Sequence, residues 1–305
     1  MTMTAHSVRI FVTAIGLAGV ASAATNPTAD EIITKARSYL GSEAALTAVK
    51  SVHFVGTMET EEPAPPKTGT EQAAPPGPRK VTTPIDIIFQ KPYRQRIVVT
   101  TANAIQTTGL DDYDGWQQVQ ERAASGRWRL ALLQPEMIKK LRANTWENLN
   151  FFLGIEKRGG TVRVVGPATV EGVAAVKVIF EHEPGISFTR YFDAGTGRLI
   201  LTETDRGDRI KEEGEMIAGG VRFPQKVTSV SAGTDATGKP TGVRTVIVFD
   251  RITVNETVPD STFEVPAIPT SVAPAAESPG VEPPALLPSA SPAAPVPVAP
   301  PPTTP

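Results

Sequence analysis

The chain has 305 residues, contains no cysteine and has a formal net charge of −2 at pH 7. Without cysteine, neither a disulfide nor an acylated N-terminal cysteine can form, so an ordinary hydrophobic core must stabilise the fold. The nearly neutral charge lacks the basic excess of nucleic-acid-binding proteins. We therefore expect a globular protein, monomeric, with no nucleic-acid partner.

The N-terminus is organised like a secretory signal. Arg9 precedes an apolar run over residues 10–20, and the small residues Ala21, Ser22 and Ala23 follow it; this order is typical of a cleaved signal peptide. An uncleaved membrane anchor is the alternative, but the apolar run is well short of the roughly 20 residues that span a bilayer. We expect a signal peptide over residues 1–23, cleaved after Ala23, and a soluble periplasmic protein.

The folded domain is expected over residues 24–266 and begins with a helix. Thr28 and Glu31 have the spacing of a capping box, in which the threonine hydroxyl accepts an amide hydrogen bond and the glutamate reaches back. Gly41 is expected to end this helix in a left-handed conformation. A shorter helix over residues 42–49 follows, and from Lys50 the apolar period changes from 3.6 to 2.

Alternating apolar and polar residues predict about 11–13 strands. Their short, glycine-marked links require mostly antiparallel neighbours. Two amphipathic helical segments, over residues 135–141 and 144–152, interrupt the strands. The predicted strands cover residues 50–58, 85–90, 93–100, 104–110, 116–120, 127–133, 161–166, 173–182, 186–193, 198–204, 209–217, 221–230 and 242–254. The fold class is therefore α+β.

Two segments are poor folding material. Residues 61–80 contain six prolines, which neither pair within a sheet nor continue a helix, and we expect a mobile hairpin loop there. Residues 267–305 are almost entirely Pro, Ala, Ser, Val and Thr, a composition that buries too little apolar surface to offset ordering entropy. We expect a disordered tail, whose use as a spacer or docking arm stays open.

No local pattern supports a catalytic or metal centre. The segment Gly233 to Lys239 resembles a phosphate loop, but Pro240 stands where a Ser or Thr is required. Beyond the signal the only histidines are His53 and His182, too few for a histidine-rich zinc site. We expect no enzyme activity, no metal and no cofactor; a hydrolase with an unrecognised site is the competing hypothesis.

A sheet of this many strands tends to curl, and two helical segments are few to fill its concave side. We therefore expect an apolar ligand cavity, with ordinary core packing as the alternative for each lining residue. The expected lining residues are Ile85, Ile87, Phe89, Ile97, Val99, Trp116, Trp128, Leu130, Val176, Val178 and Phe188.

Four segments carry a family resemblance: the helix over residues 28–41, FTRYFDAGTGRL at 188–199, GGVRFP at 219–224 and ITVNETVPDSTFEVP at 252–266. Together they resemble the LolA/LolB-like superfamily of outer-membrane lipoprotein-sorting proteins. The resemblance implies an unclosed, strongly curved antiparallel β-barrel with a helical lid over an apolar cavity that receives acyl chains.

What the resemblance implies for function is a non-enzymatic envelope protein that binds an acyl chain or a lipid-bearing partner, with outer-membrane lipoprotein sorting as one such role. The alternative is an envelope-stress sensor or regulator that uses the same fold to contact an inner- or outer-membrane protein. Lipid recovered from the purified protein would favour the first reading, and a bound membrane regulator the second.

Overall fold

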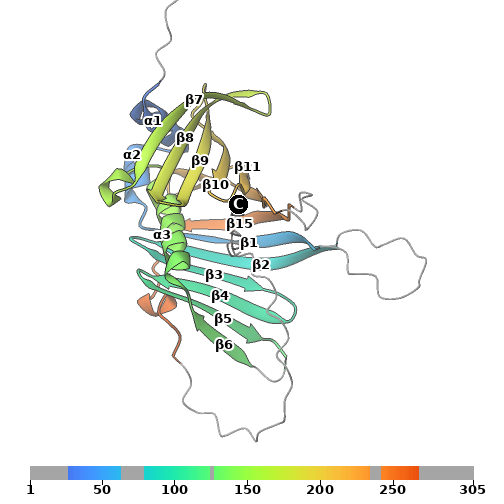
Figure 1. Cartoon of the computed structure of the whole chain (residues 1–305). Helices are drawn as coiled ribbons and strands as arrows, with labels where there is room; N and C mark the ends of the chain where they lie inside the picture. The colour runs from blue at the N-terminus through green and yellow to red at the C-terminus, as the bar shows by residue number, and fades with distance from the viewer. Residues whose placement is uncertain (1–26, 63–78, 124–126, 234–241, 268–305) are drawn as a thin grey trace, which may run out of the picture. The chain divides into compact units, whose positions relative to one another are not determined.

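A computed structural model describes residues 27–62, 79–123, 127–233 and 242–267 (Figure 1). The expected signal peptide, most of the proline-rich loop, the tail and most of the phosphate-loop-like segment lie outside these residues. The chain divides into two units, Met1–Val265 and Pro266–Pro305, and the described helices and strands all belong to the first. None of the described helices combines the length and the apolar character needed to cross a bilayer.

The described residues form one 13-stranded antiparallel sheet with two free edges. One wing runs outward from the centre in chain order: β1 (Ser51–Glu62), β2 (Arg79–Gln90), β3 (Arg94–Thr100), β4 (Ala104–Asp111), β5 (Asp114–Glu121) and β6 (Trp128–Leu132). The other runs back from the far edge: β7 (Thr161–Val170), β8 (Val173–Glu183), β9 (Ile186–Asp193), β10 (Leu199–Thr204), β11 (Arg209–Glu213), β14 (Lys226–Val230) and β15 (Arg244–Val254).

Pairing of β1 with β15 joins the two wings, and β6 and β7 remain unpaired with each other. The sheet is curved but not closed (Figure 1). This confirms the α+β class and the unclosed antiparallel barrel.

The helices are α1 (Ala29–Leu40), α2 (Glu43–Ala48) and α3 (Pro135–Asn150), and short 3-10 turns cover Glu156–Arg158 and Asp260–Thr262. Because α3 connects β6 to β7, it must pass from one edge of the sheet to the other, and it packs across β2 to β5 (Figure 1). The expectation of two separate helical segments is wrong. Asn144 does not cap a second helix; it lies inside α3, where its side-chain amide donates to Gln95.

The N-terminal helix forms as expected, but its end does not. Thr28 and Glu31 make both hydrogen bonds of the capping box. Gly41, however, has a φ of 165° and is extended, not left-handed. It bridges to Val221, and a Cβ at position 41 would lie 2.7 Å from the carbonyl oxygen of Gly220. Close backbone approach, rather than a positive φ, therefore explains this glycine.

Two predicted strands are each divided in the structure. Gly214 has a φ of 69°, which ends β11 and redirects the chain into a small hairpin of β12 (Met216–Ala218) and β13 (Val221–Phe223). This hairpin leaves the large sheet and packs over it: the rings of Phe223 and Phe54 lie 5.8 Å apart, edge to face. The hairpin thus helps to fill the interior, a function that alternation alone does not predict.

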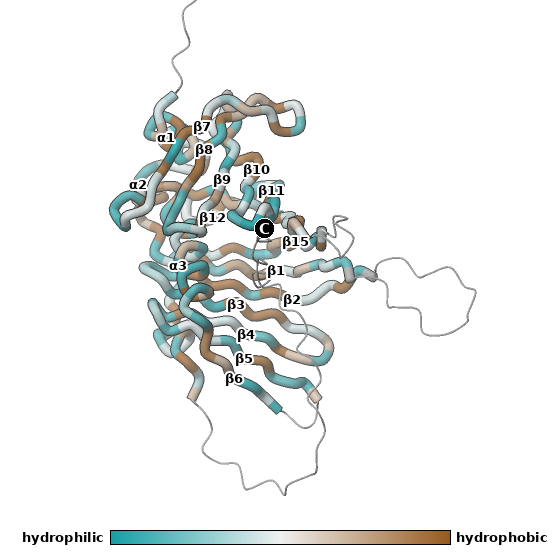
Figure 2. Tube along the Cα trace, in the orientation of Figure 1, coloured by the Kyte–Doolittle hydropathy of each residue, from teal (hydrophilic) through white to brown (hydrophobic). Residues whose placement is uncertain are grey.

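Two main apolar clusters form the core. The first joins α2 and the end of α3 to the central strands; its buried members include Val52, Phe54, Ile87, Phe89, Leu149, Phe151 and Phe249. The second places α1 over β8 and β9; it includes Ile32, Ile33, Ala36, Val178, Phe180 and Phe192. Figure 2 shows the apolar stretches of the central strands beside the mixed character of α3.

Candidate ligand-binding face and its helical lid

Five of the predicted lining residues lie together on the concave face of the first wing. In the register of β2 and β3, Ile87 pairs with Ile97 and Ile85 with Val99. Phe89 is on the same face, two residues beyond Ile87. Ile85, Ile87 and Phe89 are buried, whereas Ile97 and Val99 remain partly exposed at the margin of the first core cluster.

The partly exposed margin continues across the centre of the sheet. Met58 on β1 pairs with Ile247 on β15, which in turn pairs with Val227 on β14. All three pack against the first core cluster and are only partly buried. We call the set Met58, Ile97, Val99, Val227 and Ile247 the apolar strip.

Trp116, Trp128 and Leu130 lie on the opposite face of the sheet. Their position follows from Gly115, whose added Cβ would lie 2.7 Å from Ile138 of α3, so that Gly115 faces the helix and Trp116 faces away. The register of β5 with β6 puts Trp128 and Leu130 on the same side as Trp116. The structure therefore does not bring these three residues to the apolar strip.

The second wing holds the remaining predicted residues in a separate group. Val178 is fully buried beneath α1, and Val176 packs at the edge of the same cluster. Phe188 lies farther along the strand pair, with its ring edge to face with His182 at 5.7 Å between centroids. These residues line the concave side of the second wing.

The contact between α3 and the first wing includes a buried polar group. Gln95 on β3 is fully buried. Its Oε1 accepts hydrogen bonds from Thr145 Oγ1 and Asn144 Nδ2, each at 3.2 Å. Its Nε2 has no hydrogen-bond partner within the described residues. An unpaired buried amide costs free energy, so this contact stabilises the packing of α3 on the sheet less than apolar contacts would.

On its other side α3 carries a buried ionic group. Glu147 forms an ion pair with Arg190 on β9 and a hydrogen bond with His182 on β8, and its side chain is 6% exposed. Burial raises the pKa of Glu147, but the nearby Arg190 and His182 outweigh it and hold that pKa below its ordinary value. Glu147 is therefore ionised beneath the helix.

Aromatic rings surround the arginine of this group. The Arg190 guanidinium lies 4.8 Å from the centroid of Phe152, 4.9 Å from that of Phe180 and 5.6 Å from that of Phe188. Its Nε has no hydrogen-bond partner among the described residues. Desolvation of such a group offsets much of the attraction to Glu147, so the ion pair contributes little net stability.

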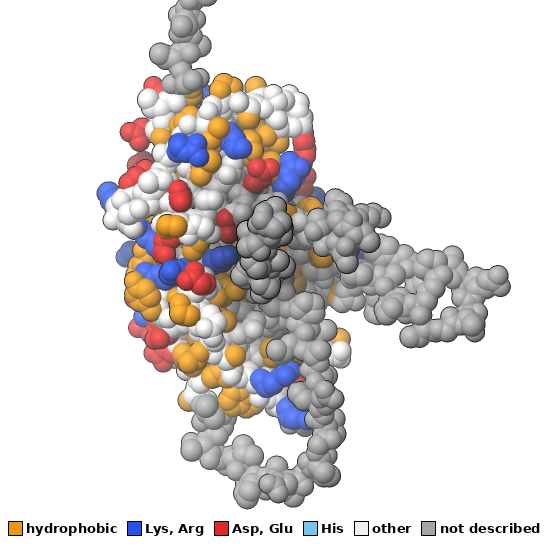
Figure 3. Space-filling model, viewed as in Figure 1, with side chains coloured by type: hydrophobic (Ala, Val, Ile, Leu, Met, Phe, Trp, Pro, Cys, Tyr) orange, Lys and Arg blue, Asp and Glu red, His pale blue; other side chains and the backbone are white. Residues whose placement is uncertain are grey.

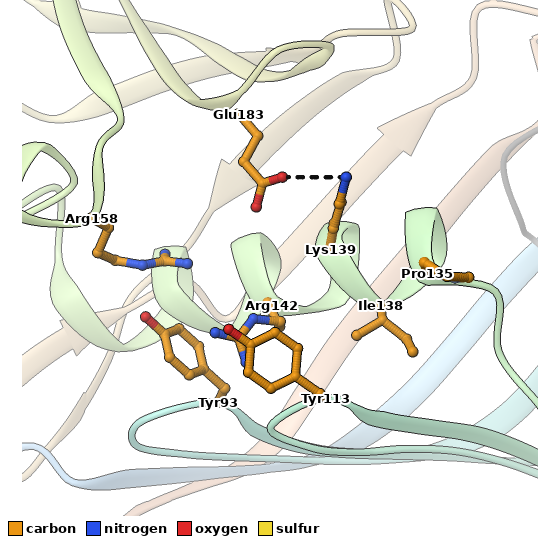
Figure 4. Close-up of a pocket in the computed structure, with 8 residues that line it drawn as sticks. All are labelled: Tyr93, Tyr113, Pro135, Ile138, Lys139, Arg142, Arg158 and Glu183. Atoms are coloured by element: carbon orange, nitrogen blue, oxygen red, sulfur yellow. Dashed lines mark ion pairs between the residues drawn. The ribbon is translucent and has the colours of Figure 1, made fainter.

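A pocket of about 530 Å³ opens beside α3, between turns of the two wings (Figure 4). The lining residues are Tyr93, Tyr113, Pro135, Ile138, Lys139, Arg142, Arg158 and Glu183. In Figure 3, basic, acidic and hydrophobic side chains lie next to one another over the middle of the molecule. Within the described residues, no group of three or more histidine, cysteine, aspartate and glutamate side chains is placed to hold a metal ion.

Aromatic and cationic groups alternate along this pocket. The Arg142 guanidinium lies 3.8 Å from the Tyr113 centroid and 3.9 Å from the Tyr93 centroid. Arg158 follows, at 4.7 Å from Tyr93 and 4.5 Å from Trp146. Cation–π contacts of this kind hold guanidinium groups in fixed positions.

Glu147, Arg190 and Arg158 were not among the predicted site residues. The sequence does carry a signal for Arg190. Strand alternation places Arg190 on the same face as Phe188 and Phe192, and the other residues of that face are apolar. A charge in an apolar register indicates a buried ionic partner. Glu147 and Arg158 carry no such local signal, because their partners come from distant segments.

No family model matches the sequence, and no curated protein matches it. Among solved structures, an outer-membrane lipoprotein-sorting protein domain from Vibrio parahaemolyticus aligns with a TM-score of 0.48 and 10% identity, over 77% of this chain and 97% of its own. A LolA superfamily protein from Nitrosomonas europaea aligns with a TM-score of 0.47 and 12% identity, over 78% and 98%.

A DUF1329 family protein from Desulfovibrio piger aligns with a TM-score of 0.47 and 11% identity, over 77% of this chain and 96% of its own. The solved structures similar to this chain thus include a LolA-superfamily protein and a lipoprotein-sorting domain.

Proposed function

We propose that this is a non-enzymatic protein of the bacterial envelope that binds an acyl chain, or a partner carrying one, between α3 and the concave face of the sheet. Outer-membrane lipoprotein sorting is one role that fits. The observation that carries the proposal is the combination of a partly exposed apolar strip with a lid helix attached through buried polar groups.

Ligand entry requires the lid to move. Separating α3 from the sheet rehydrates Gln95, Glu147 and Arg190, groups whose burial is only partly compensated. An acyl chain would then replace water on the apolar strip, and each buried CH₂ contributes about 0.8 kcal/mol. The balance of these two effects makes an opening of the lid coupled to lipid binding physically reasonable.

A covalent tether tests the role of the lid. Because the chain has no cysteine, the pair Gln95→Cys and Thr145→Cys can be joined by a short thiol-reactive bridge between β3 and α3. Binding of a fluorescent C16 fatty acid is expected when the thiols are free and to be lost when they are bridged.

The matched control bridges Thr60→Cys to Val81→Cys, a cross-strand pair of β1 and β2 away from α3, and should retain binding. Equal binding by the bridged lid variant, or no fatty-acid binding by the unmodified protein, would contradict the proposal. Lipid extraction from protein purified out of its native host, followed by mass spectrometry, identifies the natural ligand.

A further inference from the structure

We infer that the pocket beside α3 binds a phosphate group, from a lipid headgroup or a free phosphoester. The inference rests on the proposed function only for the lipid source of that phosphate. The pocket itself is defined by four groups: Lys139, Arg142, Arg158 and Glu183, together with the two tyrosines (Figure 4).

Arg158 supplies an uncompensated charge. Within the described residues it has no carboxylate within ion-pair distance, and its one polar contact is His182 Nδ1 at 3.5 Å from Nη1. The rings of Tyr93 and Trp146 hold its guanidinium while its N–H groups remain available. A planar guanidinium with free donors is the group that proteins use most effectively for phosphate.

The other cations are already partnered. Arg142 binds the Asp112 side chain and, at 3.0 Å, the Asp112 carbonyl. Lys139 lies 3.3 Å from Glu136 and 3.7 Å from Glu183. Lys139 can exchange the distant Glu183 for a phosphate oxygen, because a contact of 3.7 Å between exposed groups contributes little.

The tyrosines suit the same ligand. Neither the Tyr93 nor the Tyr113 hydroxyl has a hydrogen-bond partner among the described residues, and Tyr113 is 68% exposed. Both rings come from hairpin turns of the first wing and face the pocket (Figure 4). A hydroxyl donor next to guanidinium groups complements phosphate oxygens.

The pocket is also placed for an amphiphile. Pro135 and Ile138 line it on α3, and Ile138 also contacts the concave face at Gly115. A phosphate held at Arg158 would therefore lie at the edge of the lid, with its acyl chain directed beneath α3. This arrangement places a charged headgroup site beside apolar side chains of α3.

The test compares three probes by calorimetry at low salt: dodecyl phosphate, dodecanol and inorganic phosphate. Arg158→Gln is expected to weaken dodecyl phosphate binding about tenfold or more, since it removes charge-assisted hydrogen bonds. Glu183→Gln should strengthen it several-fold, because it removes the one acidic group of the pocket lining. Opposite effects of these two neutralisations cannot arise from a purely structural role.

The matched control is Arg163→Gln, the same change at an exposed position of β7, and it should leave all three affinities unchanged. Circular dichroism checks folding, and Arg158→Lys, which keeps the charge, should recover part of the binding. Unchanged dodecyl phosphate affinity in both Arg158→Gln and Glu183→Gln, or equal losses in Arg163→Gln, would overturn the inference.

The probes also separate this inference from the proposed function. Dodecyl phosphate binding tighter than that of inorganic phosphate indicates a lipid headgroup, and equal affinities indicate a free phosphoester; both support the phosphate site. If the unmodified protein does not bind dodecanol but binds phosphate in a manner that depends on Arg158, the acyl-chain proposal is contradicted and the phosphate site is supported.

Discussion

The indole N–H of Trp116 donates to the backbone carbonyl of Phe263 at 2.8 Å, and both residues are almost completely buried. Arg94 reinforces the same junction, with its guanidinium 5.8 Å from the Phe263 ring centroid and an ion pair to Asp260. The closing segment is thus fastened to β3 and β5 on the face opposite α3. This contact explains why β15 is followed by a turn and the buried Phe263.

Disrupting this junction should destabilise the domain. Phe263→Ala removes a fully buried ring and should lower the free energy of unfolding by about 3–5 kcal/mol. Trp116→Phe removes the hydrogen bond as well as part of the ring, with an expected loss of about 1–3 kcal/mol. Urea denaturation measures both.

Trp128→Phe, at a partly exposed site, serves as the control and should change stability by less. Equal losses of stability in the two tryptophan variants would contradict a stabilising role of the Trp116–Phe263 hydrogen bond.

Removing one partner of the buried Glu147–Arg190 ion pair should lower the free energy of unfolding more than removing both partners. Glu147→Gln leaves Arg190 charged among aromatic rings, and we expect a loss of about 3–5 kcal/mol in the free energy of unfolding. Adding Arg190→Met should restore most of that stability, because neither charge is then buried. Chemical denaturation of the two variants tests this.

An exposed ion pair gives the contrast. Glu215 pairs with Arg222, and the two side chains are 39% and 44% exposed, so Glu215→Gln should cost less than about 1 kcal/mol. A Glu147→Gln variant as stable as Glu215→Gln would show that Glu147 does not neutralise Arg190.

Glu147 also predicts a pH dependence. Its pKa is lower in the folded protein than in the unfolded chain, so the stabilisation is present above the ordinary pKa of glutamate, about 4.5, and is lost as pH falls through the folded value. Denaturation between pH 7 and pH 3 should show this acid loss, and Glu147→Gln should reduce it. Unchanged acid sensitivity in the variant would contradict the prediction.

Glu212 should have the opposite effect on the pH dependence of stability. Burial raises its pKa, and Arg190 only partly counteracts that effect. A carboxyl with a raised folded pKa stabilises the fold below its unfolded pKa, and that stabilisation is lost as pH rises through the folded value. Glu212→Gln should therefore raise stability at pH 7 more than at pH 4. Thermal melts at the two pH values would show no such difference if Glu212 were freely hydrated.

Gly56 should tolerate no side chain. A Cβ there would lie 2.1 Å from the carbonyl oxygen of Val248, at the bulge where β1 pairs with β15 and the two wings join. Gly56→Ala must separate two backbones, so we expect a loss of about 3 kcal/mol or more, at the upper end for overpacked sites.

Gly185→Ala is the control for this substitution. Its Cβ meets no atom within 4 Å, and only its positive φ of 80° opposes alanine, so the loss should be about 1 kcal/mol. Equal denaturation midpoints for the two variants would contradict a close approach of the β1 and β15 backbones at Gly56.

Local patterns were sufficient for much of the fold. The capping box at Thr28, the alternation in β2 and β3 and the turn glycines depend on interactions within a few residues, so they can be read from the chain itself. They predicted most of the strand positions, the antiparallel pairing and the shared face of Ile85, Ile87 and Phe89. Gly41 was misinterpreted because the backbone that it approaches, at Gly220, is 179 residues away.

The sequence by itself determined which residues of each strand share a face, since successive side chains on a strand alternate. Only the tertiary structure decided which of those faces is concave. Trp116 and Gly115 show why: α3 packs against the glycine and the closing segment against the tryptophan, so packing between distant segments, not alternation, selects the inner side. The same long-range packing brought Glu147 to Arg190 and Arg158 to Tyr93, contacts that no local pattern encodes.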